Sequence, residues 1–442
     1  MILEFLSSAV MGSIVGYGYY LKQNGATNDA AKMQRIFRNC GLVVKENGKE
    51  GNGKITREVQ LYRRKKEAWG TEYIYRIPLG LSFSDFEKKL DHIKDGLNNK
   101  KAFIDINMDD IKGLNLKENI PNQLKSLLEQ KKNLHKNVDL TYDGMLRVKV
   151  FNQSIPKGVE YQEKSKGWKI LVGKTHYDEV FHDFEEIPHM VVGGATRYGK
   201  SNFLNSMIMT LLKNNPNNVT FTLIDLKGGN EFGDYEHLKH VVGYAEEPED
   251  AEIVLENAVN LMIKKRKEMR RKGFRNVQKA KDPHRHFVII DEVGELNPEE
   301  AITKEEKKMK ERCQTYMSKI ARLGAGWGFR QILATQYPTG DIIPRQCKQN
   351  SDAKLCFRVQ NGIASKVVLD DVGAEDLPLI KGRAIYQMPD RKVILQTPLI
   401  SDQTINETIK PYIQKKARDP FANTTRNEGG GDSLIDEETW VH

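Results

Sequence analysis

The segment of this chain with the most specific chemical pattern is an eight-residue glycine-rich loop of the form G-x-x-x-x-G-K-S. It follows the apolar run MVVGG and precedes the helical pattern SNFLNSMIMTLL, so we expect it to join a strand to a helix. Glycines let a backbone wrap around a phosphate, and the loop amides and the helix N-terminus supply hydrogen-bond donors and positive potential. The residues predicted to bind nucleotide are Gly194, Ala195, Thr196, Arg197, Tyr198, Gly199, Lys200, Ser201 and Asn202.

Two residues of this loop have predicted roles in chemistry. The ammonium of Lys200 is expected to reach the β and γ phosphates of ATP, and the hydroxyl of Ser201 is expected to ligate Mg2+. ATP and Mg2+ are therefore the expected cofactors.

A second apolar run, HFVIIDE, ends in two carboxylates. Asp291 is expected to hold the magnesium, and Glu292 to polarise the attacking water as general base. The next run, QILATQ, ends in Gln336, which could orient that water or contact the γ phosphate. The alternative is that Gln336 is an ordinary strand terminus.

The elements that must position these residues follow a pattern of apolar strands separated by longer helical stretches. The strand-like runs are KILVG, HMVVGG, VTFTLID, HFVIID, RQILATQ and AKLCFRV. Such alternation predicts a mostly parallel α/β sheet, whose strands present their carboxyl ends at one common edge. The runs GRAIYQM and KVILQTP are expected to close the domain as a hairpin.

A smaller α+β domain is expected before this parallel α/β domain. We assign residues 23–54 to a linker, 55–165 to the small domain, 166–410 to the α/β domain with the glycine-rich loop and 411–442 to a flexible acidic tail. Apolar residues at helical spacing predict a helix after Ser84, its expected N-cap. Residues 116–137 are expected to form a Lys-rich connecting helix.

The N-terminus carries seventeen uncharged residues, from Phe5 to Leu21. As a helix at ~1.5 Å per residue this run would reach about 25 Å, close to the hydrocarbon core of about 30 Å. Basic residues follow the run and none precedes it, which predicts a single-pass anchor over residues 1–22 with the rest of the chain on the cytoplasmic side of the cell membrane. The alternatives are a buried or peripheral helix, which would make the protein cytoplasmic, and a signal peptide.

Composition restricts the remaining classes. The chain has 442 residues with 69 basic and 60 acidic side chains, a formal charge of +9, which favours a polyanionic partner. Four scattered cysteines exclude a disulfide framework. Eight basic residues between Lys264 and Arg275 form either a solvated helix end or a surface that tracks phosphates.

Six segments between about residues 165 and 400 occur in an order that is typical of one group of motors. They are GKTHYDEVFHDFEEIPHMVVGGATRYGKS, LIDLKGGNEF, EDAEIVLENAVNLMIKKRKEM, VIIDEVGEL, ILATQYP and SDAKLCFRVQNGIASKVVLDDVGAEDLPLIKGRAIY. In these segments the chain resembles the FtsK/SpoIIIE/HerA-type DNA translocases, most of all the coupling and transfer translocases of Gram-positive conjugative elements and plasmids. The resemblance implies a RecA-like P-loop NTPase that forms a homohexameric ring, threads DNA through its pore and hydrolyses ATP at subunit interfaces.

The family pattern also implies an arginine finger that acts on the neighbouring subunit. Its expected position falls at Ala325, so Arg322 and Arg330, which flank that position, are the candidates. Asp225-Leu-Lys227 stands where the family often shows Asp-Pro-Lys, and its role stays open.

The resemblance implies an ATP-driven DNA translocase that acts as coupling protein in conjugative transfer. A relaxase and conjugation-channel proteins are the expected partners. The alternatives are a motor for chromosome partition or phage DNA packaging, and a P-loop ATPase that energises protein secretion. The residues after Leu399 are too few for a winged-helix reader domain, so we expect DNA binding with little sequence preference.

Overall fold

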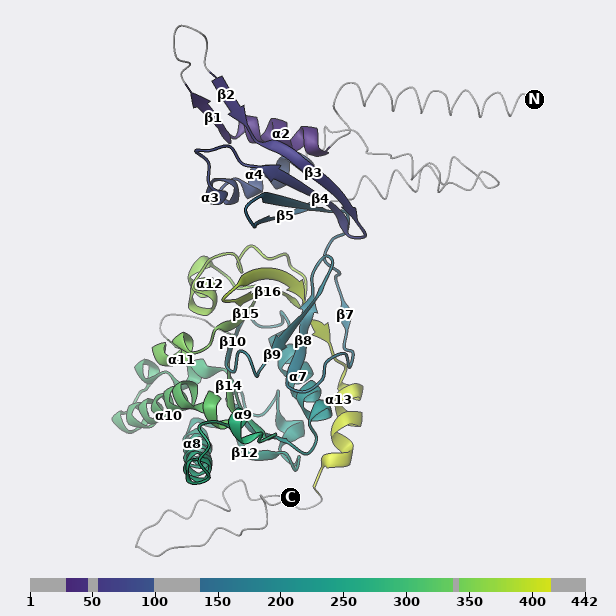
Figure 1. Ribbon diagram of the computed structural model, residues 1–442. Coiled ribbons are helices and arrows are strands. Elements are labelled where there is room, and N and C mark those ends of the chain that lie inside the picture. Colours follow the sequence, from purple (N-terminus) through teal and green to yellow (C-terminus); the bar gives the residue numbers. More distant parts are fainter. Residues whose placement is uncertain (1–28, 47–54, 99–135, 337–341, 415–442) are drawn as a thin grey trace, which may run out of the picture. The chain divides into compact units, whose positions relative to one another are not determined.

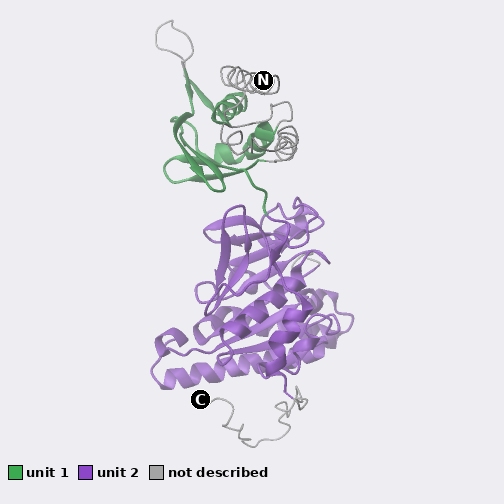
Figure 2. Cartoon of the chain, turned by 90° about the vertical axis from the view of Figure 1, so that its right-hand side faces the viewer, with its two compact units in different colours: residues 1–155 green, residues 156–442 purple. Residues whose placement is uncertain are grey.

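The chain forms two compact units, residues 1–155 and 156–442, coloured separately in Figure 2. The computed structural model describes residues 29–46, 55–98, 136–336 and 342–414. Unit 2 begins earlier than the motor boundary that we expected after residue 165. The reason is a pairing over long sequence distance: β7 (Val159–Glu160) lies parallel to β18 (Pro398–Leu399).

Unit 1 contains, in its described part, a four-stranded antiparallel sheet in the order β3–β4–β6–β5. These strands are β3 (Gln60–Glu67), β4 (Gly70–Arg76), β5 (Asn137–Tyr142) and β6 (Leu146–Phe151), and a separate hairpin is formed by β1 (Val43–Glu46) and β2 (Ile55–Glu58). The helices are α2 (Asp29–Asn39), α3 (Phe83–Glu87) and α4 (Leu90–Asn98). Their apolar residues pack with alternate residues of the strands, including Tyr73 and Tyr75 of β4, so the helices cover one face of the sheet.

Helix α2 and strand β1 replace part of the linker that we predicted over residues 23–54. Ala30, Met33 and Phe37 of α2 are buried against the sheet, and Phe37 makes edge-on contacts with Tyr75 and Phe86. Their spacing of three and four residues is helical. The polar composition around them hid this signal, and the tertiary contacts stabilise the helix.

The predicted N-cap at Ser84 is wrong. Helix α3 is capped by Ser82, whose backbone amide donates to the carboxylate of Asp85 at 2.8 Å. This is a capping box, in which the third helical residue reaches back to the cap. A short break then separates α3 from α4.

Unit 2 contains, over its described residues, a ten-stranded sheet in the order β12–β11–β13–β14–β10–β15–β16–β17–β8–β9. The strands are β8 (Lys169–Lys174), β9 (Glu179–Asp183), β10 (Met190–Gly193), β11 (Val219–Asp225), β12 (Val241–Ala245), β13 (Arg285–Asp291), β14 (Phe329–Thr335), β15 (Ala353–Phe357), β16 (Arg383–Met388) and β17 (Arg391–Gln396). All six strand-like runs of the sequence form strands. Five of them are parallel, whereas β8 pairs antiparallel with β9 and β17. The predicted hairpin is β16–β17.

Helices cover both faces of this sheet, as Figure 1 shows. Their bounds are α7 (Lys200–Asn214), α8 (Pro248–Arg271), α9 (Val277–Ala280), α10 (Lys304–Leu323), α11 (Arg345–Gln349), α12 (Gly362–Leu369) and α13 (Asp402–Ile409), with 3-10 turns η1 (Gly233–Tyr235), η2 (Val293–Leu296), η3 (Pro298–Glu300), η4 (Gly324–Trp327) and η5 (Lys410–Tyr412). Val288 and Ile290 of β13 join the core under α8 and α10, and Phe287 and Ile289 join the core under α7. Because successive strand residues face opposite sides, a strand buried on both faces needs the continuous apolar run seen in the sequence.

The predicted membrane anchor, residues 1–22, lies outside the described residues, as does most of the predicted connecting helix at 116–137. No helix in the described part of the chain combines the length and the apolar character that a bilayer span needs. The acidic tail is described only to residue 414, where the Gln414 amide donates to the His237 carbonyl at 3.0 Å. The chain is therefore tied to the motor slightly beyond residue 410.

Candidate nucleotide site

The glycine-rich loop connects the end of β10 to the start of α7, as the sequence predicts. Gly199 caps α7 with φ at 114°, and Gly194 has φ at 155°. A Cβ at Gly194 would stand 2.5 Å from the Cβ of Phe357, so the loop passes too close to β15 for a larger residue. The first-turn amides of α7 have no carbonyl partner within the helix and can bind an anion.

Backbone hydrogen bonds from three distant segments hold the loop in place. The Gly194 amide donates to the Thr335 carbonyl at 3.2 Å, and the Ala195 amide donates to the Arg358 carbonyl at 2.9 Å. The Gly382 amide donates to the Tyr198 carbonyl at 2.8 Å. Neither Arg358 nor Gly382 was a predicted site residue. For Gly382, the signal was the GRAIY segment that begins there and that carries part of the family resemblance.

Strand order brings the predicted catalytic residues to the same edge. Strand β14 pairs with β10 on one side and with β13 on the other, so the polar end of β14 lies between the loop and Glu292. The registers match Gly193 with Thr335 and Asp225 with Asp291. Four strand ends therefore meet beside the N-terminus of α7, as expected for a parallel sheet.

Lys200 and Asp291 form a buried ion pair at the centre of this edge. Their side chains are 3% and 0% exposed, and the Lys200 ammonium donates to one carboxylate oxygen of Asp291. The other oxygen, Oδ2, is buried and has no hydrogen-bond partner among the described residues. Burial raises the pKa of Asp291 above its ordinary value, while the charges of Lys200 and Lys227 oppose that shift.

Glu292 follows Asp291 and is also buried. Its Oε1 accepts from the Thr335 hydroxyl at 2.8 Å, and its Oε2 accepts from the Gln336 amide at 3.0 Å. The Gln336 side chain accepts from the Thr196 hydroxyl at 2.9 Å. Gln336 thus contacts Glu292 through its backbone amide and the glycine-rich loop through its side chain, and its role in hydrolysis stays a prediction.

Asn202 does not contribute its side chain to the site. Its amide nitrogen donates to the Ile400 carbonyl at 2.8 Å, and its oxygen accepts from the Ile400 amide at 3.3 Å. These bonds tie α7 to the segment that follows β18. We correct the prediction: the Asn202 side chain supports the fold. Thr196 and Arg197, in contrast, are exposed in the loop.

Of the two candidates for the arginine finger, Arg330 is excluded by its surroundings. Its side chain is 1% exposed, and its guanidinium donates to the carbonyls of Phe184 at 2.7 Å and Ala325 at 3.1 Å and to the carboxylate of Glu185 at 2.9 Å. Burial lowers the pKa of Arg330 to about 10, so it stays cationic at neutral pH. A group that is bonded on all sides within its own subunit cannot reach a neighbour. Arg322, at the end of α10, is exposed and remains the candidate.

The basic cluster lies at the end of α8. Because α8 connects parallel strands, it runs back across the sheet and its end lies at the edge opposite the glycine-rich loop. Lys265 is not free to contact a ligand, since its ammonium pairs with Asp282 at 3.1 Å. Arg270 and Lys272 are exposed but engaged, since Arg270 lies over the Trp327 ring and Lys272 pairs with Glu268. We call the other exposed members the basic helix end: Lys264, Lys267, Arg271 and Arg275.

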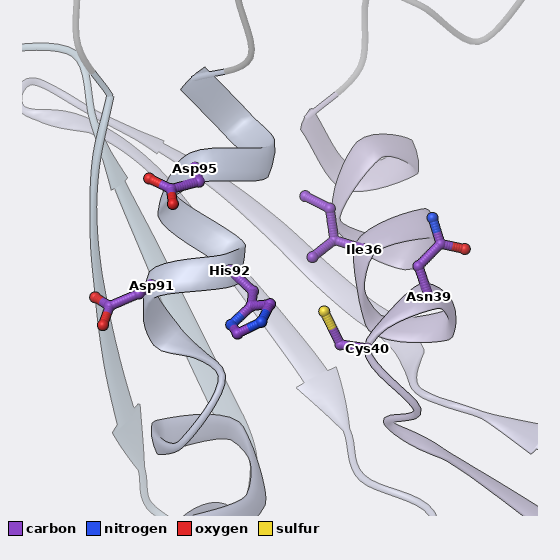
Figure 3. Close-up of a pocket in the computed structure, with 6 residues that line it drawn as sticks. All are labelled: Ile36, Asn39, Cys40, Asp91, His92 and Asp95. Atoms are coloured by element: carbon purple, nitrogen blue, oxygen red, sulfur yellow. The ribbon is translucent and has the colours of Figure 1, made fainter.

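Unit 1 has a shallow pocket between α2 and α4, shown in Figure 3. His92 and Cys40 point into the space between the two helices, whereas Asp91 and Asp95 point away from it. No predicted site residue lines this pocket. Because the carboxylates diverge, its side chains do not converge on a ligand.

The residues at the strand edge fit a magnesium nucleotide. The unpartnered oxygen of Asp291 and the hydroxyl of Ser201, which is partly exposed beside Lys200, are ligands that Mg2+ prefers. The free amides of α7 and the Lys200 ammonium suit the phosphates. A doubly covered, mainly parallel sheet with this loop and an Asp-Glu strand end defines an α/β protein of the P-loop NTPase class.

Comparison with known proteins agrees with this class and confirms the resemblance inferred from the motifs. Residues 155–293, which contain both the glycine-rich loop and Glu292, match the family model of the FtsK/SpoIIIE family. The chain is 28% identical over 269 residues to a DNA translocase FtsK of Caldanaerobacter subterraneus subsp. tengcongensis, with 59% of this chain and 36% of that protein aligned. A Clostridium acetobutylicum DNA translocase FtsK is 26% identical over 281 residues, 58% of this chain and 35% of that protein.

This chain spans about a third of the length of these curated relatives. Among solved structures, its fold is similar to that of the pCW3 conjugation coupling protein TcpA, in a monomer form with ATPγS. The TM-score is 0.55 at 21% identity, and the alignment covers 87% of this chain and 99% of TcpA. The similarity therefore includes residues outside the segment matched by the family model.

Proposed function

We propose that this chain is an ATP-driven DNA translocase of the FtsK/SpoIIIE type, with a RecA-like motor that works as a hexameric ring and serves as coupling protein in conjugative DNA transfer. The observation that carries the proposal is the strand edge that places Lys200, Asp291 and Glu292 beside the glycine-rich loop. The names of the relatives, DNA translocase and conjugation coupling protein, support the choice of DNA and of conjugation.

Each residue of the site has a role in this mechanism. The amides of the loop and of α7 bind the phosphates, and Lys200 neutralises charge at the β and γ positions. Ser201 and Asp291 would hold Mg2+, which would neutralise the charge that develops on the phosphate oxygens. Glu292 takes a proton from the attacking water, and Gln336 orients that water. Arg322 would act as the finger of the neighbouring subunit.

The basic helix end is our candidate for contact with DNA. Exposed lysines and arginines bind phosphates without reading bases, which fits a motor that accepts any sequence. Residues 1–22 would anchor the chain so that the motor faces the cytoplasm, and a relaxase and conjugation-channel proteins would deliver and accept the DNA.

The experiment that tests the proposal is ATP hydrolysis by the full chain without a polymer, with DNA of random sequence, and with an unfolded protein. We expect hydrolysis to rise with DNA and to be unaffected by the protein. Stimulation by protein alone would overturn the DNA assignment. A second experiment distinguishes conjugation from chromosome partition. In a coupling protein, Glu292→Gln should lower the transfer frequency of the mobile element from donor cells. In a partition motor, the same substitution should disturb chromosome segregation instead.

A further inference from the structure

The carboxylate of Glu292 is held on both oxygens. In addition to Thr335 and the Gln336 amide, the Lys227 ammonium lies 2.9 Å from Oε2. Glu292 is 3% exposed as a residue, so bulk water has little access to it. A general base must accept a proton from water, and in this arrangement each oxygen of Glu292 already accepts a hydrogen bond, which leaves fewer lone pairs for water.

The loop that carries Lys227 is itself fixed. Buried Asp225 accepts backbone hydrogen bonds from Glu231 at 2.7 Å and Phe232 at 2.9 Å through one oxygen. Gly229, two residues after Lys227, has φ at 72°, in the left-handed region that favours glycine. The hydrogen bonds of Asp225 therefore hold the loop that places Lys227 beside Glu292.

The backbone of Glu292 is also constrained. Its φ is 65°, in the left-handed region that non-glycine residues rarely adopt. Such conformations persist where the surroundings enforce them, and they are frequent at functional sites. Here the conformation directs the side chain toward the end of β14, where Thr335 and Gln336 receive it.

We propose that Lys227 is a positioning residue that, together with Thr335 and the Gln336 amide, clamps Glu292 in a resting position, and that hydrolysis requires release from this clamp. The inference rests on the proposed function, because it takes Glu292 as the base. Lys227 is the partner that can leave, because its buried ammonium holds Glu292 by charge alone, without a hydrogen bond, whereas Thr335 and the Gln336 backbone amide donate hydrogen bonds. The clamp would suppress hydrolysis when no DNA is bound.

The test compares ATP hydrolysis by the full-length wild type and Lys227→Met, with and without DNA. We expect Lys227→Met to raise the DNA-free rate by about fivefold, since loss of one of three contacts shifts the population toward released Glu292. The KM for ATP should stay unchanged. Lys227→Arg should restore the low DNA-free rate, and Thr335→Val, which removes another donor at constant shape, should raise it.

Lys348→Met is the matched control, because the side chain of Lys348, like that of Lys227, is 24% exposed and ion-paired, but with Asp370. Its DNA-free rate should equal that of the wild type. A Lys227→Met enzyme whose DNA-free rate is unchanged or lower would overturn the clamp, as would a raised KM with a lower kcat, which indicates a structural defect or a direct contact with ATP.

Hydrogen exchange at the Gln336 amide gives a readout that does not depend on hydrolysis. This amide donates to Glu292, so the clamp predicts slow exchange in the wild type and faster exchange in Lys227→Met. Equal exchange in the two proteins would contradict the clamp. If the wild type showed no ATP hydrolysis, the proposed function would fail, and the exchange comparison would still decide whether Lys227 holds Glu292.

Discussion

Lys200 and Glu292 lie at the same edge of the sheet, but different interactions hold their side chains in place. Lys200 neutralises a carboxylate, Asp291, that is completely buried. Removing one partner of a buried ion pair leaves the other charge uncompensated, which costs about 3–5 kcal/mol. Glu292, in contrast, is held by hydrogen bonds to donors that a glutamine can partly keep.

We therefore predict different outcomes for Lys200→Ala and Glu292→Gln. Both should abolish ATP hydrolysis, but Lys200→Ala should also weaken ATP binding and lower the free energy of unfolding. Glu292→Gln should bind ATP normally and lose less stability than Lys200→Ala, because glutamine keeps an acceptor for Thr335 or the Gln336 amide although it no longer neutralises Lys227. The measurements are binding of a fluorescent ATP analogue, urea unfolding and turnover.

The turnover rate of Glu292→Gln tests whether Glu292 is the general base. Turnover by Glu292→Gln above a tenth of the wild-type rate would mean a loss of less than about 1.4 kcal/mol of transition-state stabilisation. That value is too small for the removal of a general base, and another residue would then have to take the role.

At the scale of elements, Arg330 joins three segments at the edge of the sheet opposite the glycine-rich loop. It binds the Phe184 carbonyl after β9, the Ala325 carbonyl in η4, and Glu185, which also pairs with Arg285 at 2.6 Å. A guanidinium has five donors, so one side chain can satisfy several buried acceptors at once. Arg330 therefore stabilises the junction between β9, η4 and β14.

Substitutions of Arg330 and Arg322 should have different effects, because only Arg330 belongs to this hydrogen-bond network. Arg330→Met should lower the free energy of unfolding by about 3 kcal/mol, because it leaves buried acceptors without a donor. Arg322→Ala should change it by less than ~0.5 kcal/mol, as is usual at an exposed site, and reduce DNA-stimulated hydrolysis by about 1000-fold if Arg322 is the finger. Urea unfolding and steady-state hydrolysis measure both quantities. A stable Arg330→Met with no hydrolysis would reverse this assignment.

Three buried histidines make the stability of unit 2 depend on pH. Burial lowers the pKa of His182, His189 and His286 to about 3, with Arg330 adding to the effect at His189 and Lys265 at His286. An unfolded histidine has a pKa near 6.5, so between about pH 3 and 6.5 the unfolded chain binds more protons than the folded one. The contribution to stability is complete above about pH 6.5 and falls as the pH is lowered.

We predict that His182→Gln flattens this dependence. Each buried histidine should contribute a slope of about 1.4 kcal/mol per pH unit, and the variant should lose one such contribution. The Tyr386 hydroxyl, 2.7 Å from Nδ1 of His182, keeps an amide as partner. Urea unfolding between pH 7 and 5, followed by tryptophan fluorescence, measures the slope. His92→Gln, at an exposed site of unit 1, is the control and should leave it unchanged.

At the scale of the whole molecule, the net charge of +9 indicates a surface for DNA only where exposed basic side chains gather. The nucleotide site and the basic helix end lie at opposite edges of one sheet, so a motor could bind ATP and DNA at the same time. Much of the remaining charge is neutralised locally, for example by the bond between Arg312 of α10 and Glu252 of α8 at 2.5 Å.

Neutralising the basic helix end should weaken DNA binding in a salt-dependent manner. Each lost phosphate contact lowers the slope of log affinity against log salt by ~0.9, so Lys267→Gln with Arg271→Gln should lower it by about 2. DNA titrations at several salt concentrations measure the slope. Lys304→Gln with Lys308→Gln removes the same charge from the exposed start of α10. An equal effect of both double variants would mean that net charge, and not this surface, controls binding.

The strands of unit 2 and the core of its nucleotide site could be predicted because their signals are local. A strand buried on both faces needs an unbroken apolar run, and a loop that wraps a phosphate needs glycines at Gly194 and Gly199. Helix α2 and the cap at Ser82 were missed because polar sequence obscured the first, and because Ser82 and Ser84 are equally good caps by residue type.

The sequence by itself predicted which residues have the chemical groups for binding and hydrolysing ATP, since a P-loop and an Asp-Glu strand end are short contiguous patterns. Tertiary structure decided which of those residues are available. It buries Arg330 against Phe184, 146 residues away, ties Asn202 to Ile400, and places Lys227 on Glu292. These contacts join residues that are distant in the chain, and their energies depend on burial and on partner groups that only the assembled sheet brings together.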